Sequence, residues 1–440
     1  MNLKIAQLMA KPTRDIAWLQ KALQSAVELE LATLPPYLCG FWALQDRSSV
    51  PAKQIFSIAK QEMSHFGLAC NMLVATGGKP DILGGYSQIQ YPGPLPGGVR
   101  PKCDRTFFPC EPDFQVSLGF PDFKTFALMC MQIEYPEDPV PRPVLLAAEA
   151  ETFPSIGEFY NAVLEAFQLN DGKFQYQVTN QRQGALGIFI VDGLLKATAA
   201  LQRIQQEGEG SSKNPFYAPG KLSHFYAFGE LYFGKKYVFN EANKTGYWTG
   251  DPVNIPPVYE MTPVPPGGYS NPPAEVVECD QIFTTMLKQL DSAWGGGGDA
   301  ALNDAIDSMV TLGGKATDLL KKQIPRENGL GIYGPQFKIY AGPPMTRGGK
   351  NPTPSGGNTV SVSFAKDILP LFRTIDIDHM GRRGVRLDDY KYMSDSSGDH
   401  AHAQAVLDTL KDKEMPPGGP FWPQDKLDLF AKWMSDGYQP

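Results

Sequence analysis

Residues 61–66 read QEMSHF, which places Glu62 three positions before His65. The surrounding stretch, 51–76, is typical of a helix, because a proline suits its first turn and the Gly-Gly pair that follows suits a C-terminal cap. Residues three apart share one face of a helix, so this carboxylate and imidazole can hold the same ion. A lone pair of this kind also occurs as a surface Glu beside a packed His, and the rest of the sequence has to decide between the two.

A second signal lies in residues 26–32, AVELELA, within a helix predicted over 14–43. A buried carboxylate must be paired, protonated or bound to a metal, and Glu28 and Glu30 are too close for both to face the core. Glu30 is therefore a candidate ligand, with Glu28 in reserve. We expect the Pro-Pro pair at 35–36 to kink or break this helix.

Two later stretches supply further candidates. Glu158 is bracketed by large apolar residues in 156–160, IGEFY, although a carboxylate there also suits the N-terminus of a helix. Glu207 and Glu209 end another predicted helix, and His224 opens the next apolar stretch. We take Glu209 as the candidate and keep Glu207 in reserve.

In chain order these residues fit a bundle that binds two metal ions, in which two helices each supply a Glu and two others each supply a Glu-x-x-His. The fourth element departs from this pattern, because fifteen positions separate Glu209 from His224, and an inserted segment would have to bring them together. Carboxylates with two imidazoles favour iron, with manganese as an alternative. The predicted metal ligands are Glu30, Glu62, His65, Glu158, Glu209 and His224.

The same stretches resemble a known family, the ferritin-like domain of the iminophenyl-pyruvate dimer synthases, which couple indole-pyruvate imines in violacein, rebeccamycin and staurosporine biosynthesis. The resemblance rests on LELATLPPYL at 29–38, QEMSHF at 61–66 with NMLVATGGKP at 71–80, IGEFY at 156–160, and EGEG at 207–210 followed by His224. It implies that the six candidates are the metal ligands and that the bundle, with extra helices, extends to about residue 340.

The last 80 residues resemble a small cytochrome c fold. FAKDILPLF at 364–372 and MPPGG at 415–419 carry this likeness, and His379 and Met415 occupy the positions of haem ligands. Ile375 and Asp378 stand where the two haem-attachment cysteines belong, so covalent haem is excluded. We expect a haemless docking or capping domain, with non-covalent haem as the alternative.

The sequence thus predicts an all-α protein: a ferritin-like bundle with long Gly/Pro-rich loops over 1–342, a linker over 343–360, and a small helical cytochrome c-like domain over 361–440. Gly and Pro dominate the linker. Besides 14–43 and 51–76, helices are predicted at 122–134, 144–168, 191–206, 223–233, 281–293 and 301–322, with a flexible joint at the Gly run 295–298.

Composition narrows the functional classes. The chain has 440 residues and a net charge of −7 without basic blocks, so we expect neither a nucleic-acid nor a membrane partner. The longest apolar run, 185–195, is too short to span a bilayer, and the N-terminus lacks the apolar core of a signal peptide. We expect a cytoplasmic protein with six reduced cysteines.

These patterns lead to one functional hypothesis: a non-haem dinuclear metal enzyme that uses O₂ on a small amine, imine or amino-acid-derived substrate. Tyr37 and Tyr160 are candidate catalytic residues that could donate a hydrogen bond or an electron, although core packing would also explain them. The loop 81–120 and the Pro-rich segment 251–273 are candidates to cover the site. Alternatives are a non-catalytic metal-binding bundle and, less well supported, iron storage; a homodimer or a pathway-enzyme partner is possible.

Overall fold

The computed structural model describes residues 4–99, 114–136, 155–210, 214–326, 329, 331–342, 362–381, 383–395, 401–411, 422, 424–435 and 437–440. The chain divides into two compact units, Met1–Met345 and Thr346–Pro440, each with its own hydrophobic core. This division falls in the Gly/Pro-rich segment that the sequence marks as a linker.

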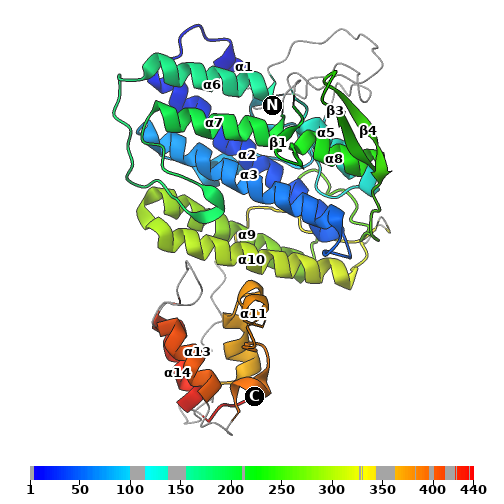
Figure 1. Ribbon diagram of the computed structural model, residues 1–440, viewed down its shortest axis with the longest axis vertical. Coiled ribbons are helices and arrows are strands. Elements are labelled where there is room, and N and C mark those ends of the chain that lie inside the picture. The colour runs from blue at the N-terminus through cyan, green and yellow to red at the C-terminus, as the bar shows by residue number, and fades with distance from the viewer. Residues whose placement is uncertain are drawn as a thin grey trace. The chain divides into compact units, whose positions relative to one another are not determined.

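Two long antiparallel helices form the centre of the first unit (Figure 1). They are α2 (Ile16–Ala43) and α3 (Val50–Ala75), and the short α1 (Lys4–Met9) precedes them. The Asp15 side chain accepts from the Trp18 amide at the start of α2, and Ser49 does the same for Ala52 at the start of α3, so each helix begins at a residue that satisfies one of its free N–H groups.

The proline pair does not break α2, which was one of the two outcomes expected from the sequence, since the helix runs through Pro35 and Pro36 to Ala43. Pro36 has no N–H to donate to the carbonyl of Ala32 one turn earlier. That carbonyl instead accepts a hydrogen bond of 2.6 Å from the hydroxyl of Tyr91. Tertiary structure therefore satisfies the acceptor that the proline leaves open.

The bundle has four helical positions, of which α2 and α3 fill the first two. Each of the other two positions is divided between two shorter helices. α6 (Ile156–Asn170) and α5 (Phe123–Ile133) both pack on α2, while α7 (Leu194–Gly208) and α8 (His224–Phe233) both pack on α3. Figure 1 shows α6 with α7 over one half of the central pair and α5 with α8 over the other. The bundle therefore has helix ends, rather than continuous helices, near its middle.

Close approach between α2 and α5 depends on Gly40. A Cβ at this position would lie 2.0 Å from the ring of Phe126, so only glycine allows the ring to rest on the α2 backbone. This contact packs the first turn of α5 against α2.

A helical hairpin, α9 (Ala274–Ser292) and α10 (Gly298–Lys322), packs against the central pair and shares its core. The glycines expected to form a flexible joint belong instead to a π-helical turn, Ala293–Gly297, with Gly296 at φ 117°. Short elements complete the unit: α4 (Ile82–Tyr86), η1 (Pro96–Gly98), η2 (Ala185–Gly187), the antiparallel pair β1 (Phe216–Ala218) and β2 (Lys221–Leu222), and the antiparallel pair β3 (Lys235–Asn240) and β4 (Thr245–Pro252), in which Tyr237 faces Trp248.

The second unit is also helical, with Phe364, Phe430 and Trp433 fully buried at its centre. Its elements are η4 (Phe364–Ile368), η5 (Leu369–Leu371), α11 (Thr374–Gly381), α12 (Tyr390–Met393), α13 (Ala401–Lys411) and α14 (Gln424–Ser435). Met415 and the side chain of His379 lie outside the described residues, so the cytochrome c resemblance stays an expectation.

The prediction of an all-α fold is confirmed, and the strands are confined to small hairpins. Within the described residues, each predicted helix is present, although several ends differ. No helix in this part of the chain combines the length and apolarity needed to cross a bilayer. Four cysteines are described, and all four are buried free thiols.

Candidate metal centre

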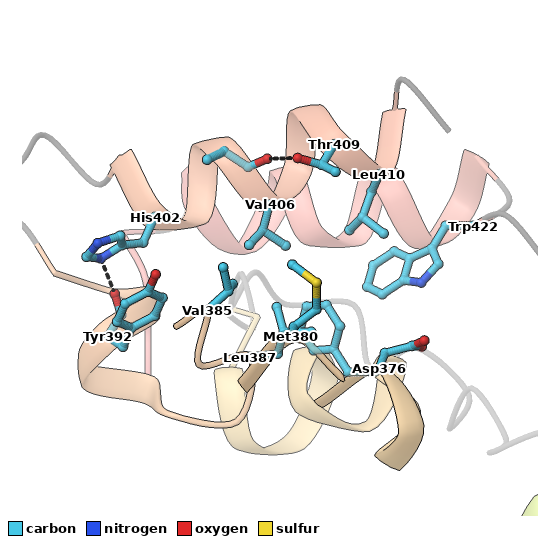
Figure 2. A pocket seen from close by; sticks show the side chains of 12 residues that line it. Asp376, Met380, Val385, Leu387, Tyr392, His402, Val406, Thr409, Leu410 and Trp422 are labelled. Atoms are coloured by element: carbon cyan, nitrogen blue, oxygen red, sulfur yellow. Dashed lines mark hydrogen bonds between the residues drawn. The ribbon is translucent and has the colours of Figure 1, made fainter. Parts of the chain in front are cut away.

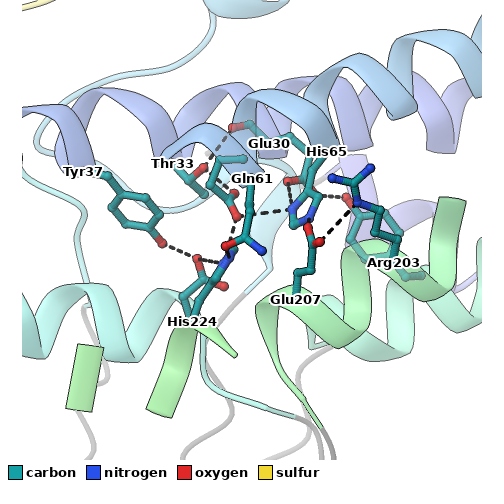
Figure 3. A network of polar contacts seen from close by, with 11 residues as sticks. Glu30, Thr33, Tyr37, Gln61, His65, Arg203, Glu207 and His224 are labelled. Carbon is teal, nitrogen blue, oxygen red and sulfur yellow. Dashed lines mark hydrogen bonds and ion pairs between the residues drawn. The ribbon is translucent and has the colours of Figure 1, made fainter. Parts of the chain in front are cut away.

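Two groups of carboxylates and imidazoles meet inside the bundle, and Glu62 belongs to both (Figure 3). The first group consists of Glu30 on α2 with Glu62 and His65 on α3. Nδ1 of His65 lies 3.3 Å from Glu62 Oε1 and 3.7 Å from Glu30 Oε2. All three side chains are buried, and one potential ligand atom from each lies within 4.8 Å of the others.

The second group consists of Glu62, Glu134 at the C-terminal end of α5, and His224 at the first residue of α8. Nδ1 of His224 lies 2.9 Å from Glu62 Oε1 and 3.4 Å from Glu134 Oε1. The two imidazole rings are 5.7 Å apart. The same Glu62 oxygen therefore lies between the two histidines, as a bridging ligand would.

The second nitrogen of each imidazole already contacts a protein oxygen. Nε2 of His65 lies 2.8 Å from Glu207 Oε2, and Nε2 of His224 lies 3.3 Å from Gln61 Oε1. In a neutral ring that carries its hydrogen on Nε2, the lone pair of Nδ1 would face carboxylate oxygens, which are also acceptors; in the protonated ring, Nδ1–H faces them as a donor.

The contact between Glu62 Oε1 and His224 Nδ1 lacks hydrogen-bond geometry, and neither atom has another hydrogen-bond partner among the described residues. Buried polar atoms without such partners are rare in folded proteins. A cation between these atoms, a proton or a metal ion, relieves the repulsion between them. The donor set fits two metal ions that share Glu62.

Three hydroxyl groups hold the carboxylates in place. Thr33 donates to Glu62 Oε2 over 2.8 Å, Tyr37 donates to Glu134 Oε1 over 2.5 Å, and Tyr160 donates to Glu30 Oε1. Burial and the neighbouring carboxylates keep the pKa of both tyrosines well above 10, so both phenols remain donors at neutral pH. At Glu30 and Glu62 these bonds leave the other oxygen directed toward a histidine, whereas at Glu134 the oxygen that accepts from Tyr37 is also the one 3.4 Å from His224 Nδ1.

The electrostatics of the metal-free cluster show how strongly it attracts positive charge. Burial opposes a charge on either imidazole, but the facing carboxylates outweigh it and raise the pKa of His65 well above 6.5 and that of His224 to about 9. Burial would also raise the pKa of Glu62, yet its contacts with the two imidazoles lower it. Burial dominates at Glu30, whose pKa rises to about 7.

The α7 carboxylates differ in position. Glu207 Oε1 lies 3.2 Å from Nε of Arg203, so Glu207 connects His65 to a cation and supports the imidazole from behind. Glu209, at the end of α7, lines a cavity of about 30 Å³ together with Glu30, Glu62 and Glu134. This cavity has room for small species such as water.

The structure brings together most, but not all, of the predicted ligands. Glu30, Glu62, His65 and His224 meet in the two groups, Glu209 borders their cavity, and the β1–β2 hairpin occupies the insertion between Glu209 and His224.

The structure does not place Glu158 in either group of candidate ligands. This residue is exposed in the first turn of α6, where it forms a capping box with Ser155. Glu28 is buried near α4, against Gly85, and is not part of either group.

Sequence reasoning missed Glu134. The signal was present, because this carboxylate stands between Ile133 and Tyr135 at the end of a strongly apolar predicted helix. Glu158 was chosen because large apolar residues flank it, and Glu134 is flanked in the same way. In the structure it is Glu134 that joins Glu62 and His224.

A helical bundle whose interior holds carboxylates and two imidazoles around a shared Glu has the residues that carboxylate-bridged metal bundles use to bind their ions. The family model described as Ferritin-like matches residues 23–233, a range that contains both groups, so this part of the chain is a ferritin-like domain. The chain is also similar to a ferritin-like protein from Caulobacter vibrioides, with 24% identity over 73% of this chain and 97% of that chain and a TM-score of 0.48. No curated protein matches the sequence.

Proposed function

We propose that this protein is a non-haem dinuclear iron enzyme that consumes O₂ and acts as an oxidase or oxygenase. The observation that supports it is that Glu62 lies between two histidines, each of which presents Nδ1 to a carboxylate pair. A buried cluster with this excess of carboxylates needs positive charge, which protons on the two imidazoles supply in the metal-free protein and a bound metal pair would supply in their place.

The donor set supports iron, with manganese as the alternative, because oxygen ligands predominate and two imidazoles complete the set. When bound, the metal pair would supply the electrons and the open coordination positions that O₂ reduction requires. Glu30, Glu62, Glu134, His65 and His224 would hold the metals, with Glu209 at the edge of the same cavity.

The remaining residues orient the ligands and exclude water. Tyr37 and Tyr160 fix two carboxylates by donating hydrogen bonds, and Glu207 fixes the ring of His65. These contacts set the ligand positions before any ion arrives, and such preorganisation lowers the cost of binding. Tyr37 and Tyr160 are also the nearest phenols for transfer of an electron or a proton to the centre.

The substrate class is proposed from the sequence resemblance to imine dimer synthases: a small amine, imine or amino-acid-derived molecule in secondary metabolism. The cavity of about 30 Å³ at the carboxylates suits entry of small species. The second candidate function is a non-catalytic metal-binding bundle, which the same ligand set would also support.

The test is O₂ uptake after anaerobic loading with Fe²⁺, with and without a panel of amines and imines. We expect rapid uptake by the wild type, at least a tenfold loss in Glu62→Gln, and wild-type behaviour in Glu158→Gln, which alters an exposed carboxylate of the same domain. A wild type that binds two irons without consuming O₂ would favour the non-catalytic bundle, and a wild type that binds no iron would refute both.

A further inference from the structure

The second compact unit contains a pocket outside the ferritin-like domain. It has a volume of about 110 Å³ and lies between α11 and α13 (Figure 2). Its walls are mainly apolar and include Phe372, Met380, Leu387, Val406, Leu410 and Trp422. Folded cores rarely leave voids much larger than one water molecule, so a space of this size is suited to a ligand.

Three of the polar side chains around this pocket are engaged with other protein groups. At one end, Asp376 accepts two hydrogen bonds of 2.7 Å from Arg373. At the other end, Nδ1–H of His402 donates to the carbonyl of Tyr392 over 3.0 Å, and along α13 the hydroxyl of Thr409 is bonded to its own helix. A ligand with several polar groups would lose hydrogen bonds to water without gaining partners here, so the pocket favours an apolar molecule.

The side chains of the pocket walls narrow the chemical class of the ligand further. Phe372 and Trp422 lie with their ring centroids 5.2 Å apart, and Tyr392 stacks on His402 at 3.9 Å. Met380 adds a thioether, and sulfur and ring edges both pack favourably on an aromatic ring. An apolar cavity of about 150 Å³ is known to hold one benzene ring, so a pocket of about 110 Å³ limits the ligand to a single ring.

We propose that the second unit binds a neutral, single-ring aromatic molecule in this pocket. The inference stands apart from the metal centre, because every residue that carries it lies in Thr346–Pro440. It assigns this unit a binding role of its own.

The probe is toluene, titrated into the full-length protein by isothermal titration calorimetry. Val406→Phe places a ring in the pocket and should weaken toluene binding at least tenfold. The matched control is Val310→Phe on α10, where the valine is 63% exposed, and it should bind toluene like the wild type. No binding by the wild type, or equal binding by Val406→Phe, would overturn the proposal.

Val406→Ala provides an independent test, because it adds no ring to the packed core of the unit. It enlarges the pocket and should allow naphthalene, a two-ring probe, to bind at least tenfold more tightly than to the wild type. Failure of this gain would count against the proposal. Haemin is the competing probe: if haemin binds stoichiometrically and displaces toluene, the site is one for a tetrapyrrole and the single-ring assignment is wrong.

Discussion

Substitution of Glu134 by glutamine tests which carboxylate completes the second metal position. Glu134 contributes only to the group that contains His224, whereas Glu62 contributes to both groups. Glutamine has nearly the same shape and keeps an oxygen that can accept from Tyr37, so the fold should persist. We expect Glu134→Gln to retain one metal per chain, Glu62→Gln to retain none, and the wild type to bind two.

The expected loss of metal affinity in Glu134→Gln follows from the negative charge that the substitution removes. A pair of unit charges about 4 Å apart at an effective dielectric constant of about 20 interacts by about 4 kcal/mol, which is a lower limit for a divalent ion, and about 1.4 kcal/mol is a tenfold change in Kd. The affinity of the second position should therefore fall at least about a thousandfold in Glu134→Gln, and the first position should change much less.

The assay is elemental mass spectrometry of protein dialysed against a weak chelator after loading, with circular dichroism to confirm folding. Glu158→Gln is the matched control and should keep two metals with little change in stability, because glutamine at this position can also complete the capping box with Ser155. If Glu134→Gln keeps both metals while Glu158→Gln loses one, the assignment of the third carboxylate is refuted.

Three other results are expected. In the metal-free protein, burial opposes a charge on His224, but the facing carboxylates raise its pKa from 6.5 to about 9. Protonated His224 should therefore add about 3 kcal/mol to the free energy of unfolding below pH 6.5, and this contribution should be lost as the pH rises to 9. Urea unfolding of chelator-treated protein measures this, and a free energy of unfolding that does not change with pH would contradict it. Glu207→Gln should weaken metal binding about 10- to 100-fold, because this residue only orients the ligand His65. The number of metal ions bound per chain should stay the same. A metal titration in which one ion is lost would show that Glu207 is a direct ligand instead. Gly40→Ala should destabilise the protein by about 1–3 kcal/mol or more, because the added methyl group would lie 2.0 Å from the ring of Phe126. The control is Gly314→Ala, which has nothing within 4 Å and should be neutral or stabilising. Thermal melts of both variants measure the difference.

The helices and the Glu62–His65 pair could be predicted from sequence because their evidence is local. Helical periodicity needs only one segment, and a pair three residues apart shares a face whatever the rest of the fold does. Glu30 followed from the same kind of reasoning, since a carboxylate among apolar residues needs a partner.

The third carboxylate could not be predicted in this way, because the third bundle position is divided between α5 and α6. A ligand can then stand at the end of one helix or the start of the next, and both Glu134 and Glu158 lie among apolar residues. The sequence did carry one distinguishing feature, since Ser155 precedes Glu158 by three positions, which is the pattern of a capping box. The contact of Glu207 with His65 depends on how α7 packs against α3, which no local pattern determines.

The Pro35–Pro36 pair makes α2 dependent on a distant segment of the chain. One bond that an ordinary helix would supply from within comes instead from Tyr91, 59 residues later. An isolated peptide of this helix would therefore lack a bond that the folded protein has, immediately after the turn that carries Glu30. Release of Tyr91 from this carbonyl would free the turn of α2 beside Glu30, so the stability of the candidate metal centre is tied to a residue outside its two ligand groups.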